Sequence, residues 1–155
     1  IKRVEQWLYK HLAEDERAAV LQTLPGVGKL TAYLLLAEIG SIERFSRPEK
    51  LASYAGLCPS TRSSGGRVHH GRTSPAGRSY LKWAFVEAAH TAVRHDSYFV
   101  RLHGRWRQHK GNGKSIVAVA RKMAMIVWRM LEEQRGYRKP NRCRSRVGSV
   151  APVAD

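Results

Sequence analysis

Acidic side chains are scarce in this sequence, and the shortage is confined to one part of the chain. The 155 residues include 12 Asp and Glu against 28 Lys and Arg, which gives a formal net charge of +16. Residues 1–50 are close to balance at +1, whereas residues 51–155 carry +15. A field of one sign over two-thirds of a chain indicates a polyanionic partner, for which nucleic acid is the default. An anionic membrane is the weaker interpretation, because no Lys/Arg-rich amphipathic helix stands out.

Cysteines and long apolar runs are scarce as well. Cys58 and Cys143 are far apart and have no CxxC partner, so we exclude a disulfide framework and expect a reducing cytosol. The sequence shows no secretory leader and no apolar run of about 18 residues, so nothing indicates export or a membrane span. It begins at Ile1 inside a helical pattern, and we therefore expect a fragment of a longer protein.

Helical patterns are abundant. Helices are predicted for residues 1–12, 16–23, 29–39, 49–55, 79–95, 97–109 and 116–131. Glycines and prolines concentrate in residues 57–78, which predicts a Gly-rich loop or a small hairpin there. We thus predict an all-α, compact helical domain over residues 15–136. The end of a coiled-coil or linker helix (1–14) precedes it, and a disordered basic tail (137–155) follows.

The turn L-P-G-V-G-K, residues 24–29, is the first candidate site. Gly26 and Gly28 permit the positive φ angles of a tight turn and leave the backbone bare. Backbone N–H groups at the positive end of the following helix form an anion site that suits a DNA phosphate, and Lys29 adds a charge. The pattern resembles a helix-hairpin-helix element, which holds the nucleic-acid backbone without reading bases. An ordinary helix-turn-helix corner is the alternative.

The loop R-S-S-G-G-R-V-H-H-G-R, residues 62–72, is the second candidate site. A serine hydroxyl needs its proton removed or its alkoxide stabilised before it is a good nucleophile. Gly65 and Gly66 would let a phosphodiester approach Ser64, and nearby cations would bind its oxygens. The side chains available for phosphate contacts are Arg62, Arg67, His69, His70 and Arg72. The two histidines are also candidate bases, and a basic linker without catalysis is the alternative for the whole loop.

Further cations fit a nucleic-acid backbone. The stretch from Ser97 to Met130 holds eight Lys and Arg and no acid, which predicts a face that follows a phosphate backbone in a salt-dependent manner. From this stretch we select Lys114, Arg121 and Lys122 as contacts, and we add Arg78, which precedes the long helix.

Aromatic and metal-ligand residues are given structural roles. Six aromatics are predicted to lie in the core rather than to stack on bases, namely Tyr80, Trp83, Phe85, Tyr98, Phe99 and Trp106. His95, Asp96 and His103 do not share one helical face and have no cysteine or carboxylate cluster beside them, so we expect no metal site in this chain.

The order of several motifs adds a resemblance. The segments L-P-G-V-G-K-L-T-A-Y-L-L-L-A-E-I-G, R-F-S-R-P-E-K-L-A-S-Y-A-G-L-C-P, S-S-G-G and G-R-T-S-P-A-G-R-S-Y-L-K-W follow one another within residues 21–131. Each segment alone is a weak signal, whereas the ordered set is specific. The sequence resembles the C-terminal domain of the insertion-sequence 110 transposases, whose relatives include the pilin-gene invertases.

The resemblance implies a nucleophile. In that family this domain supplies a serine that attacks DNA and forms a phosphoserine link. The serine lies five residues after the proline of an A-G-L-x-P motif and directly before a glycine. Counting from Pro59 gives Ser64, and the neighbouring Ser63 is the reserve. Ser74, in G-R-T-S-P-A-G, is interpreted as the N-cap of the long helix.

The resemblance also implies partners that these residues do not contain. Family members join this domain through a coiled coil to an N-terminal RuvC-like domain with an Asp/Glu/Asp/Asp metal site, where we expect Mg²⁺; this chain is expected to bind no cofactor itself. A structured guide RNA selects target and donor DNA. We expect a full-length dimer or tetramer in the bacterial cytoplasm, associated with the nucleoid.

The predicted function is therefore a DNA transposase domain that exchanges strands through a seryl-DNA intermediate and is inactive without the missing domain. A non-catalytic helix-hairpin-helix module that binds DNA or RNA is the alternative.

Overall fold

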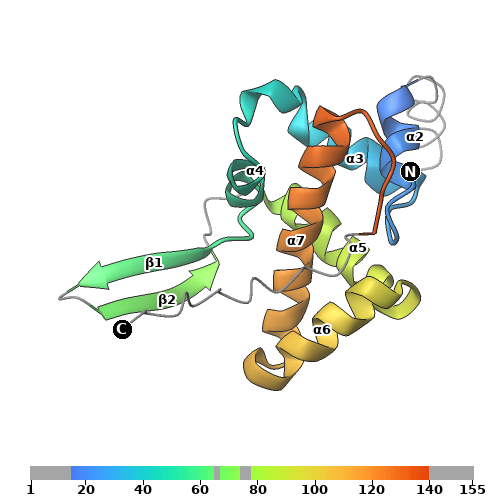
Figure 1. Cartoon of the computed structure of the whole chain (residues 1–155). Helices are drawn as coiled ribbons and strands as arrows, with labels where there is room; N and C mark the ends of the chain where they lie inside the picture. Colours follow the sequence, from blue (N-terminus) through green and yellow to red (C-terminus); the bar gives the residue numbers. More distant parts are fainter. Residues whose placement is uncertain (1–14, 65–66, 74–77, 140–155) are drawn as a thin grey trace, which may run out of the picture.

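The protein is a helical body from which one β-hairpin extends (Figure 1). The computed structural model describes residues 15–64, 67–73 and 78–139, and for residues 59–64 and 67–73 it describes the backbone. Its elements are α2 (Glu16–Gln22), α3 (Lys29–Ile39), the 3₁₀ turn η1 (Ile42–Arg44), α4 (Pro48–Tyr54), β1 (Pro59–Ser64), β2 (Arg67–Thr73), α5 (Ser79–His95), α6 (Ser97–Lys110) and α7 (Asn112–Glu132). The six helices predicted between residues 16 and 131 are confirmed, whereas η1 was not predicted. The predicted helix over residues 1–12 lies outside the described residues.

Local sequence signals fix several helix ends. Pro48 occupies the first turn of α4, where a missing N–H leaves no helical hydrogen bond unmade. Asp96 caps α6, because its carboxylate accepts hydrogen bonds from the amides of Tyr98 at 2.8 Å and Phe99 at 3.3 Å. Gly111 separates α6 from α7 with a φ of +76°, a value that other residues rarely adopt.

The start of α5 differs from the prediction. The helix begins at Ser79, and Arg78 occupies the N-cap position without a capping side-chain hydrogen bond. The interpretation of Ser74 as the N-cap is therefore wrong, because the N-cap position of α5 is four residues further along the chain. Ser74 itself lies outside the described residues.

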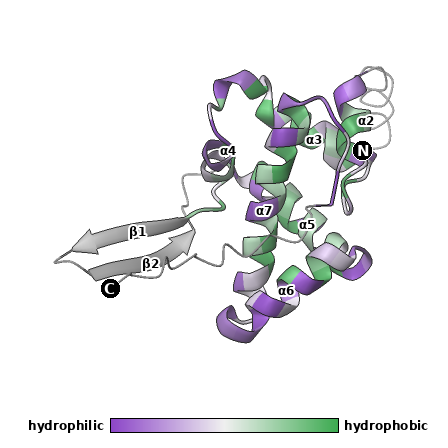
Figure 2. Cartoon of the chain, in the orientation of Figure 1, coloured by the Kyte–Doolittle hydropathy of each residue, from purple (hydrophilic) through white to green (hydrophobic). Residues whose placement is uncertain are grey.

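Helix α7 is the centre of the body. It contacts α2, α4, α5 and α6, and the apolar segments drawn in green gather where these helices meet (Figure 2). The predicted apolar stripe of α7 is buried, namely Ile116, Val119, Ala120, Met123, Val127, Met130 and Leu131. The Trp128 indole N–H donates to the carbonyl oxygen of Phe45 at 2.7 Å, which fastens the segment after η1 to this helix.

Small residues let the turn between α2 and α3 approach α5 closely. Ala84, Ala88 and Ala92 on α5 are fully buried or nearly so. Gly26 has a φ of +88°, and a Cβ atom built on it would overlap the carbonyl oxygen of Ala88. Gly26 is thus required both for the turn conformation and for the packing of this turn on α5.

The chain remains packed after α7. Residues 135–139, here called the strap, run back across the body. The Tyr137 amide donates to the Thr23 hydroxyl at 2.7 Å, and the Tyr137 ring stacks on Phe99 with centroids 6.1 Å apart. Lys139 Nζ lies 3.0 Å from a carboxylate oxygen of Asp96, which is 5% exposed. Tyr137 and Lys139, which the sequence assigned to the basic tail, thus contact the helical body; residues 140–155 lie outside the described residues.

Burial of the strap affects one titrating group. Desolvation raises the pKa of the Tyr137 phenol well above its ordinary value, and the negative charge of Asp96 acts in the same direction. The Tyr137 hydroxyl oxygen is buried and has no hydrogen-bond partner among the described residues. None of the helices in the described ranges combines the length and apolar character needed to cross a bilayer.

Candidate nucleic-acid interface

The glycine-rich segment contains a two-stranded antiparallel hairpin. Strand β1 pairs with β2, and the register changes between Pro59 and Thr61. Ser64 ends β1 and pairs with Arg67, the first residue of β2. Gly65 and Gly66, the two residues between the strands, lie outside the described residues. The backbone thus follows the hairpin alternative of the sequence prediction and places the candidate nucleophile at the end of a strand.

The register separates the two candidate serines. Arg62 pairs with His69 and Ser64 pairs with Arg67, so these four positions share one face of the hairpin, because alternate residues of a strand lie on the same face.

Ser63 occupies the opposite face, since it pairs with Val68 in the row between them. His70 alternates with Val68 along β2 and belongs to that second face, whereas Arg72 lies within the register change between His70 and Thr73 and is not assigned to a face. The two adjacent serines therefore have different neighbours. The Ser64 face carries two arginine positions: Arg62 lies two residues before Ser64, and Arg67 is its partner across the hairpin.

The base of the hairpin is fixed by a cluster around Tyr54 at the end of α4. The Arg78 amide donates to the Tyr54 carbonyl at 3.2 Å, and Arg78 Nε donates to the Tyr54 hydroxyl at 3.0 Å. Arg78 also lies 3.9 Å from Glu38, and the Arg44 guanidinium stacks over the rings of Tyr54 and Phe45 at 4.8 and 5.0 Å. Arg78 is engaged in this anchor, and its predicted contact with nucleic acid stays a prediction.

The turn at residues 24–29 has one buried and one open part. Gly26 packs against α5 as described above, so its backbone faces protein. Gly28 is the N-cap of α3, has a φ of −85° and is open to solvent, and Lys29 beside it is exposed. An anion approaching the start of α3 would therefore meet Gly28 and Lys29, and the helix-hairpin-helix interpretation of this turn stays a prediction.

The other predicted cations lie on helices of the body. Lys114 is exposed in the first turn of α7, whereas Arg121 and Lys122 are half-buried two turns further on. No ion pair joins these three side chains to a carboxylate within the described residues. The sequence did not reveal that Lys114 is more exposed than Arg121 and Lys122, because exposure depends on how α7 packs on its neighbours.

Two aromatic residues depart from the predicted core. Phe85 and Phe99 are fully buried, and Tyr98 and Trp106 are partly buried against the core, as expected. Tyr80 and Trp83 are instead 69% and 56% exposed. The core prediction is wrong for these two because they follow the outer side of α5, one turn apart. The alanine stripe of the same helix marks its inner side and was the signal that could have revealed this.

Metal-ligand residues do not converge. No group of three or more His, Cys, Asp or Glu in the described part of the chain could hold a metal ion. The carboxylate of Asp96 caps α6 and binds Lys139. His103 has a buried Nε2 atom with no partner among the described residues, and Cys58 is a free, half-buried thiol.

Comparison with known proteins gives a consistent family. Residues 18–104 match the sequence model of the transposase IS116/IS110/IS902 family. The transposase of insertion sequence element IS1111A from Coxiella burnetii is 32% identical over 160 residues, which cover 89% of this chain and 44% of that protein. The pilin gene-inverting protein of Moraxella bovis is 33% identical over 129 residues, covering 81% and 40% of the two chains. This chain therefore spans less than half the length of these relatives.

Proposed function

The chain belongs to the transposase family of the IS116, IS110 and IS902 elements, and on that premise we propose that it is the part of a DNA recombinase that supplies a serine nucleophile, Ser64. The observation that carries the proposal is the register of the hairpin. It groups Ser64 with Arg62, Arg67 and His69 on one face. Arginines at positions that share a face with a serine suit attack on a phosphodiester, because guanidinium groups bind its oxygens.

The chemistry is a pair of transesterifications. The Ser64 Oγ atom attacks the phosphorus of the scissile phosphodiester and loses its proton to solvent, which also supplies the protons taken up in the later steps. An Oγ–P bond forms, the bond from phosphorus to one sugar oxygen breaks, and that oxygen leaves as a protonated hydroxyl. The hydroxyl of another strand then attacks the same phosphorus and releases the serine, which regains a proton. The number of phosphodiester bonds is unchanged, so the exchange needs no external energy source.

The arginines stabilise charge rather than move protons. Arg62 and Arg67 bind the non-bridging oxygens, where negative charge grows in the transition state. Arginine has no role as a base, because its guanidinium stays protonated. His69 shares the Ser64 face, His70 lies on the other face, and Arg72 lies within the register change of β2; we assign all three to contacts with the phosphate backbone.

Metal chemistry, where it operates, belongs to residues outside the described part of this chain. The Mg²⁺ expected from the family resemblance needs a cluster of oxygen ligands. The described residues offer no group of three or more metal-ligand side chains, so they do not fit the ion. We therefore place the metal in the RuvC-like domain of the full-length protein and route no step through it.

Contacts with the rest of the nucleic acid come from the body. Gly28 and Lys29 at the open start of α3, together with Lys114, bind the backbone through charge and N–H groups. DNA is the substrate in this proposal, a structured guide RNA selects it, and the full-length protein acts as a dimer or tetramer. Relatives named as transposases of bacterial insertion elements and as pilin gene-inverting proteins support recombination as the class of reaction.

The experiment is covalent trapping with matched serine variants. A full-length transposase carrying this domain, its guide RNA and a nicked suicide DNA substrate are mixed and resolved under denaturing conditions. Ser64→Ala should abolish the protein–DNA adduct and the recombinants, because no other hydroxyl occupies that position. Ser63→Ala, on the other face, should retain both.

Two results would contradict the proposal. Adduct that survives Ser64→Ala and disappears with Ser63→Ala would move the nucleophile to the neighbouring position. If neither the parent protein nor any variant forms the adduct while DNA binding stays intact, the result would favour the alternative function, a non-catalytic module that binds DNA or RNA.

A further inference from the structure

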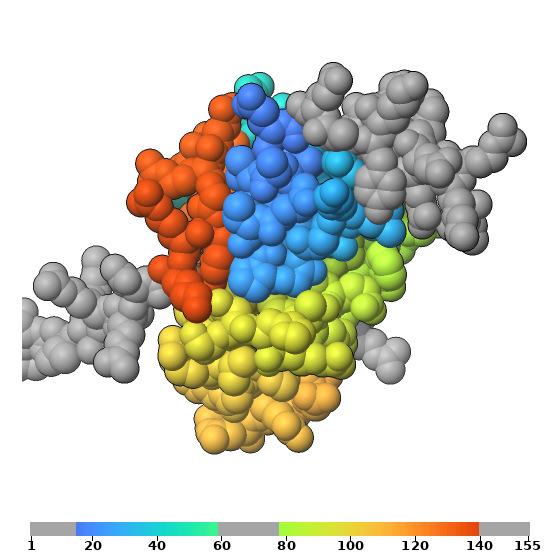
Figure 3. All heavy atoms as spheres, turned by 90° about the vertical axis from the view of Figure 1, so that its right-hand side faces the viewer, coloured from blue at the N-terminus to red at the C-terminus, as the bar shows by residue number. Residues whose placement is uncertain are grey.

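A second basic site lies at the opposite end of the body from the exposed end of the hairpin. The end of α7 and the strap enclose a pocket of about 230 Å³. Four cationic side chains and one carboxylate line it, namely Arg129, Arg135, Arg138, Lys139 and Glu133. In Figure 3 a hollow lies among the orange-red spheres of the end of α7 and the strap, beside the blue spheres of α2.

The walls of this pocket are held in place. The strap is fastened through the Tyr137 amide to Thr23, through the Tyr137 ring to Phe99, and through Lys139 to Asp96. These three attachments reach the turn after α2 and the junction of α5 with α6. A ligand would therefore meet cations on a backbone that is already ordered, which lowers the entropic cost of binding.

Two of the four cations that line the pocket have no carboxylate partner among the described residues. Glu133 lies 3.8 Å from Arg135, but both side chains are 56% exposed. Water screens such a pair, so the attraction between the two side chains is weak. Lys139 is committed to the buried Asp96 carboxylate. Arg129 and Arg138 are exposed and take part in no ion pair or side-chain hydrogen bond within the described residues. These two guanidinium groups are available for an external anion.

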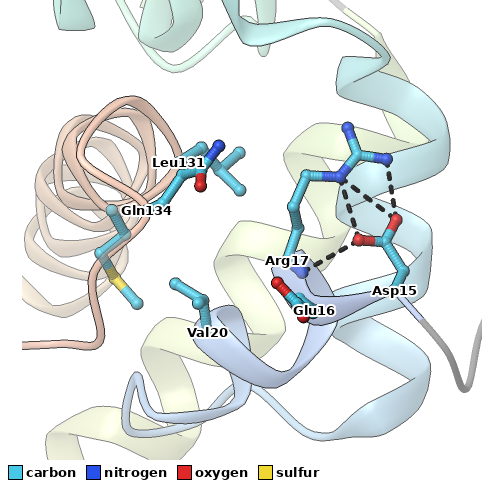
Figure 4. Close-up of a pocket in the computed structure, with 7 residues that line it drawn as sticks. Asp15, Glu16, Arg17, Val20, Leu131 and Gln134 are labelled. Carbon is cyan, nitrogen blue, oxygen red and sulfur yellow. Dashed lines mark hydrogen bonds and ion pairs between the residues drawn. The ribbon is translucent and has the colours of Figure 1, made fainter.

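A neighbouring pocket shows that this charge is not general at this end of the body. The pocket between α2 and the end of α7 is lined by Asp15, Glu16 and Arg17 (Figure 4). There Arg17 is paired with Asp15 through bonds of 2.7 and 3.0 Å, and that contact lowers the pKa of the Asp15 carboxyl. Its cation is compensated internally, so that pocket has no net attraction for a polyanion.

The strap pocket continues into a basic helix face. Lys139 Nζ donates to the Ser97 hydroxyl at 3.3 Å, which places the strap at the start of α6. Arg101 and Arg105 follow Ser97 at four-residue intervals, and both are exposed. Residues four apart lie on one face of a helix, and α6 contains no acidic residue. The cations therefore extend from a concave pocket along a line, as a phosphate backbone requires.

We propose that the strap pocket binds the phosphodiester backbone of a nucleic acid through Arg129 and Arg138, at a site separate from the hairpin. The choice of nucleic acid as the polyanion rests on the proposed function. The geometry and the charge of the pocket do not depend on it. The domain then holds one stretch of backbone at the hairpin and a second at the strap. The second stretch belongs to flanking duplex DNA or to a structured RNA, and both present the same phosphates.

The test measures how salt affects binding to the 155-residue chain. The double variant Arg129→Ala/Arg138→Ala is titrated with a random-sequence DNA duplex and with an RNA duplex of the same length at several salt concentrations. Each phosphate contact contributes about 0.9 to the slope of log K against log salt. Loss of two contacts should reduce the slope by about 2. If the slope falls with both duplexes, the pocket binds the phosphate backbone of DNA and RNA alike. If it falls with only one duplex, that nucleic acid is the ligand.

A matched control separates the pocket from net charge. Arg47→Ala/Lys50→Ala removes the same charge from exposed positions on α4 and just before it, where no ion pair joins either side chain to a carboxylate in the described part of the chain. An unchanged slope for the strap variant with both duplexes, or an equal fall for the control, would overturn the proposal. The measurement needs no covalent step, so its outcome is independent of the Ser64 experiment.

Discussion

The helical body and the hairpin differ in what holds them together. The body contains a continuous apolar core built around α7. The strands of the hairpin, P-S-T-R-S-S and R-V-H-H-G-R-T, contain one aliphatic residue, Val68. A hairpin without an apolar face gains little from folding, and an isolated one is marginal in water. The body therefore supplies the stability, and the hairpin contributes little to it.

The connection between the two regions is narrow. The hairpin departs five residues after Tyr54, and the chain returns to the same tyrosine through Arg78. The Tyr54–Arg78 contacts, together with the buried Leu57 two residues before β1, thus hold the place where the hairpin meets the body. The difference teaches that a substitution in the hairpin should change activity with little change in stability, whereas a substitution in the core should change stability first.

The largest expected effect tests this separation directly. Phe85 is fully buried, so Phe85→Ala should lower the free energy of unfolding by about 3–5 kcal/mol. The hairpin double variant Arg62→Ala/Arg67→Ala should change it by less than about 0.5 kcal/mol while abolishing the covalent adduct. Urea denaturation followed by circular dichroism measures both. A comparable loss of stability in the two variants would show that the hairpin and the body unfold as one unit, and the comparison would fail.

A smaller effect on stability is expected in the turn between α2 and α3, where Gly26 and Gly28 form a matched pair. Gly26→Ala should lower the free energy of unfolding by about 2–4 kcal/mol, because its φ of +88° is strained for alanine and the new methyl would overlap Ala88. Gly28→Ala should cost less than about 1 kcal/mol, since this position is open and has an ordinary φ. Thermal denaturation of the two variants decides it. Equal costs would mean that the approach of the turn to α5 is looser than described.

The smallest effect concerns the strap. The buried Tyr137 hydroxyl has no partner among the described residues, so Tyr137→Phe should leave the free energy of unfolding at pH 7 unchanged or slightly higher.

The same substitution has a pH signature. Because the folded-state pKa of Tyr137 lies above that of the unfolded chain, the folded state keeps its proton as pH rises through about 10 while the unfolded state loses it. The parent protein should then lose stability above that pH, and Tyr137→Phe should lose less. Unfolding curves at pH 7 and above pH 10 measure the difference. A parent and variant that respond equally to pH would show that the phenol is solvated.

Much of the helical fold was readable from local pattern. The helix at residues 29–39 has the predicted ends, since Gly28 and Gly40 flank a strongly apolar segment. The inner face of α7 follows directly from its apolar period. Tyr80 and Trp83 were predicted to be buried because they are aromatic, although their positions around α5 place them on its outer side. Phase relative to the alanine stripe is a helix-wide property, whereas aromatic character is a property of one residue.

The candidate site was only partly readable. Counting from Pro59 selected Ser64, but the pairing that groups Ser64 with Arg62 and Arg67 depends on the register of the hairpin. Gly26 was assigned to phosphate binding from its place in a turn. Its close approach to α5 involves Ala88, more than sixty residues away in the sequence, and local pattern carries no information about such a neighbour.

The sequence by itself determined the helix positions, the strong positive charge, the family and the choice of candidate nucleophile, because propensity, composition and motif order are local properties. The tertiary structure alone decided which cations remain unpaired. Lys139 and Arg129 are both exposed cations, yet Lys139 is paired with the buried Asp96, which is distant in the sequence, and Arg129 borders the strap pocket without an ion pair in the described residues. That difference depends on which carboxylates the fold brings within about 4 Å, and Coulomb interactions depend on distance in space rather than along the chain.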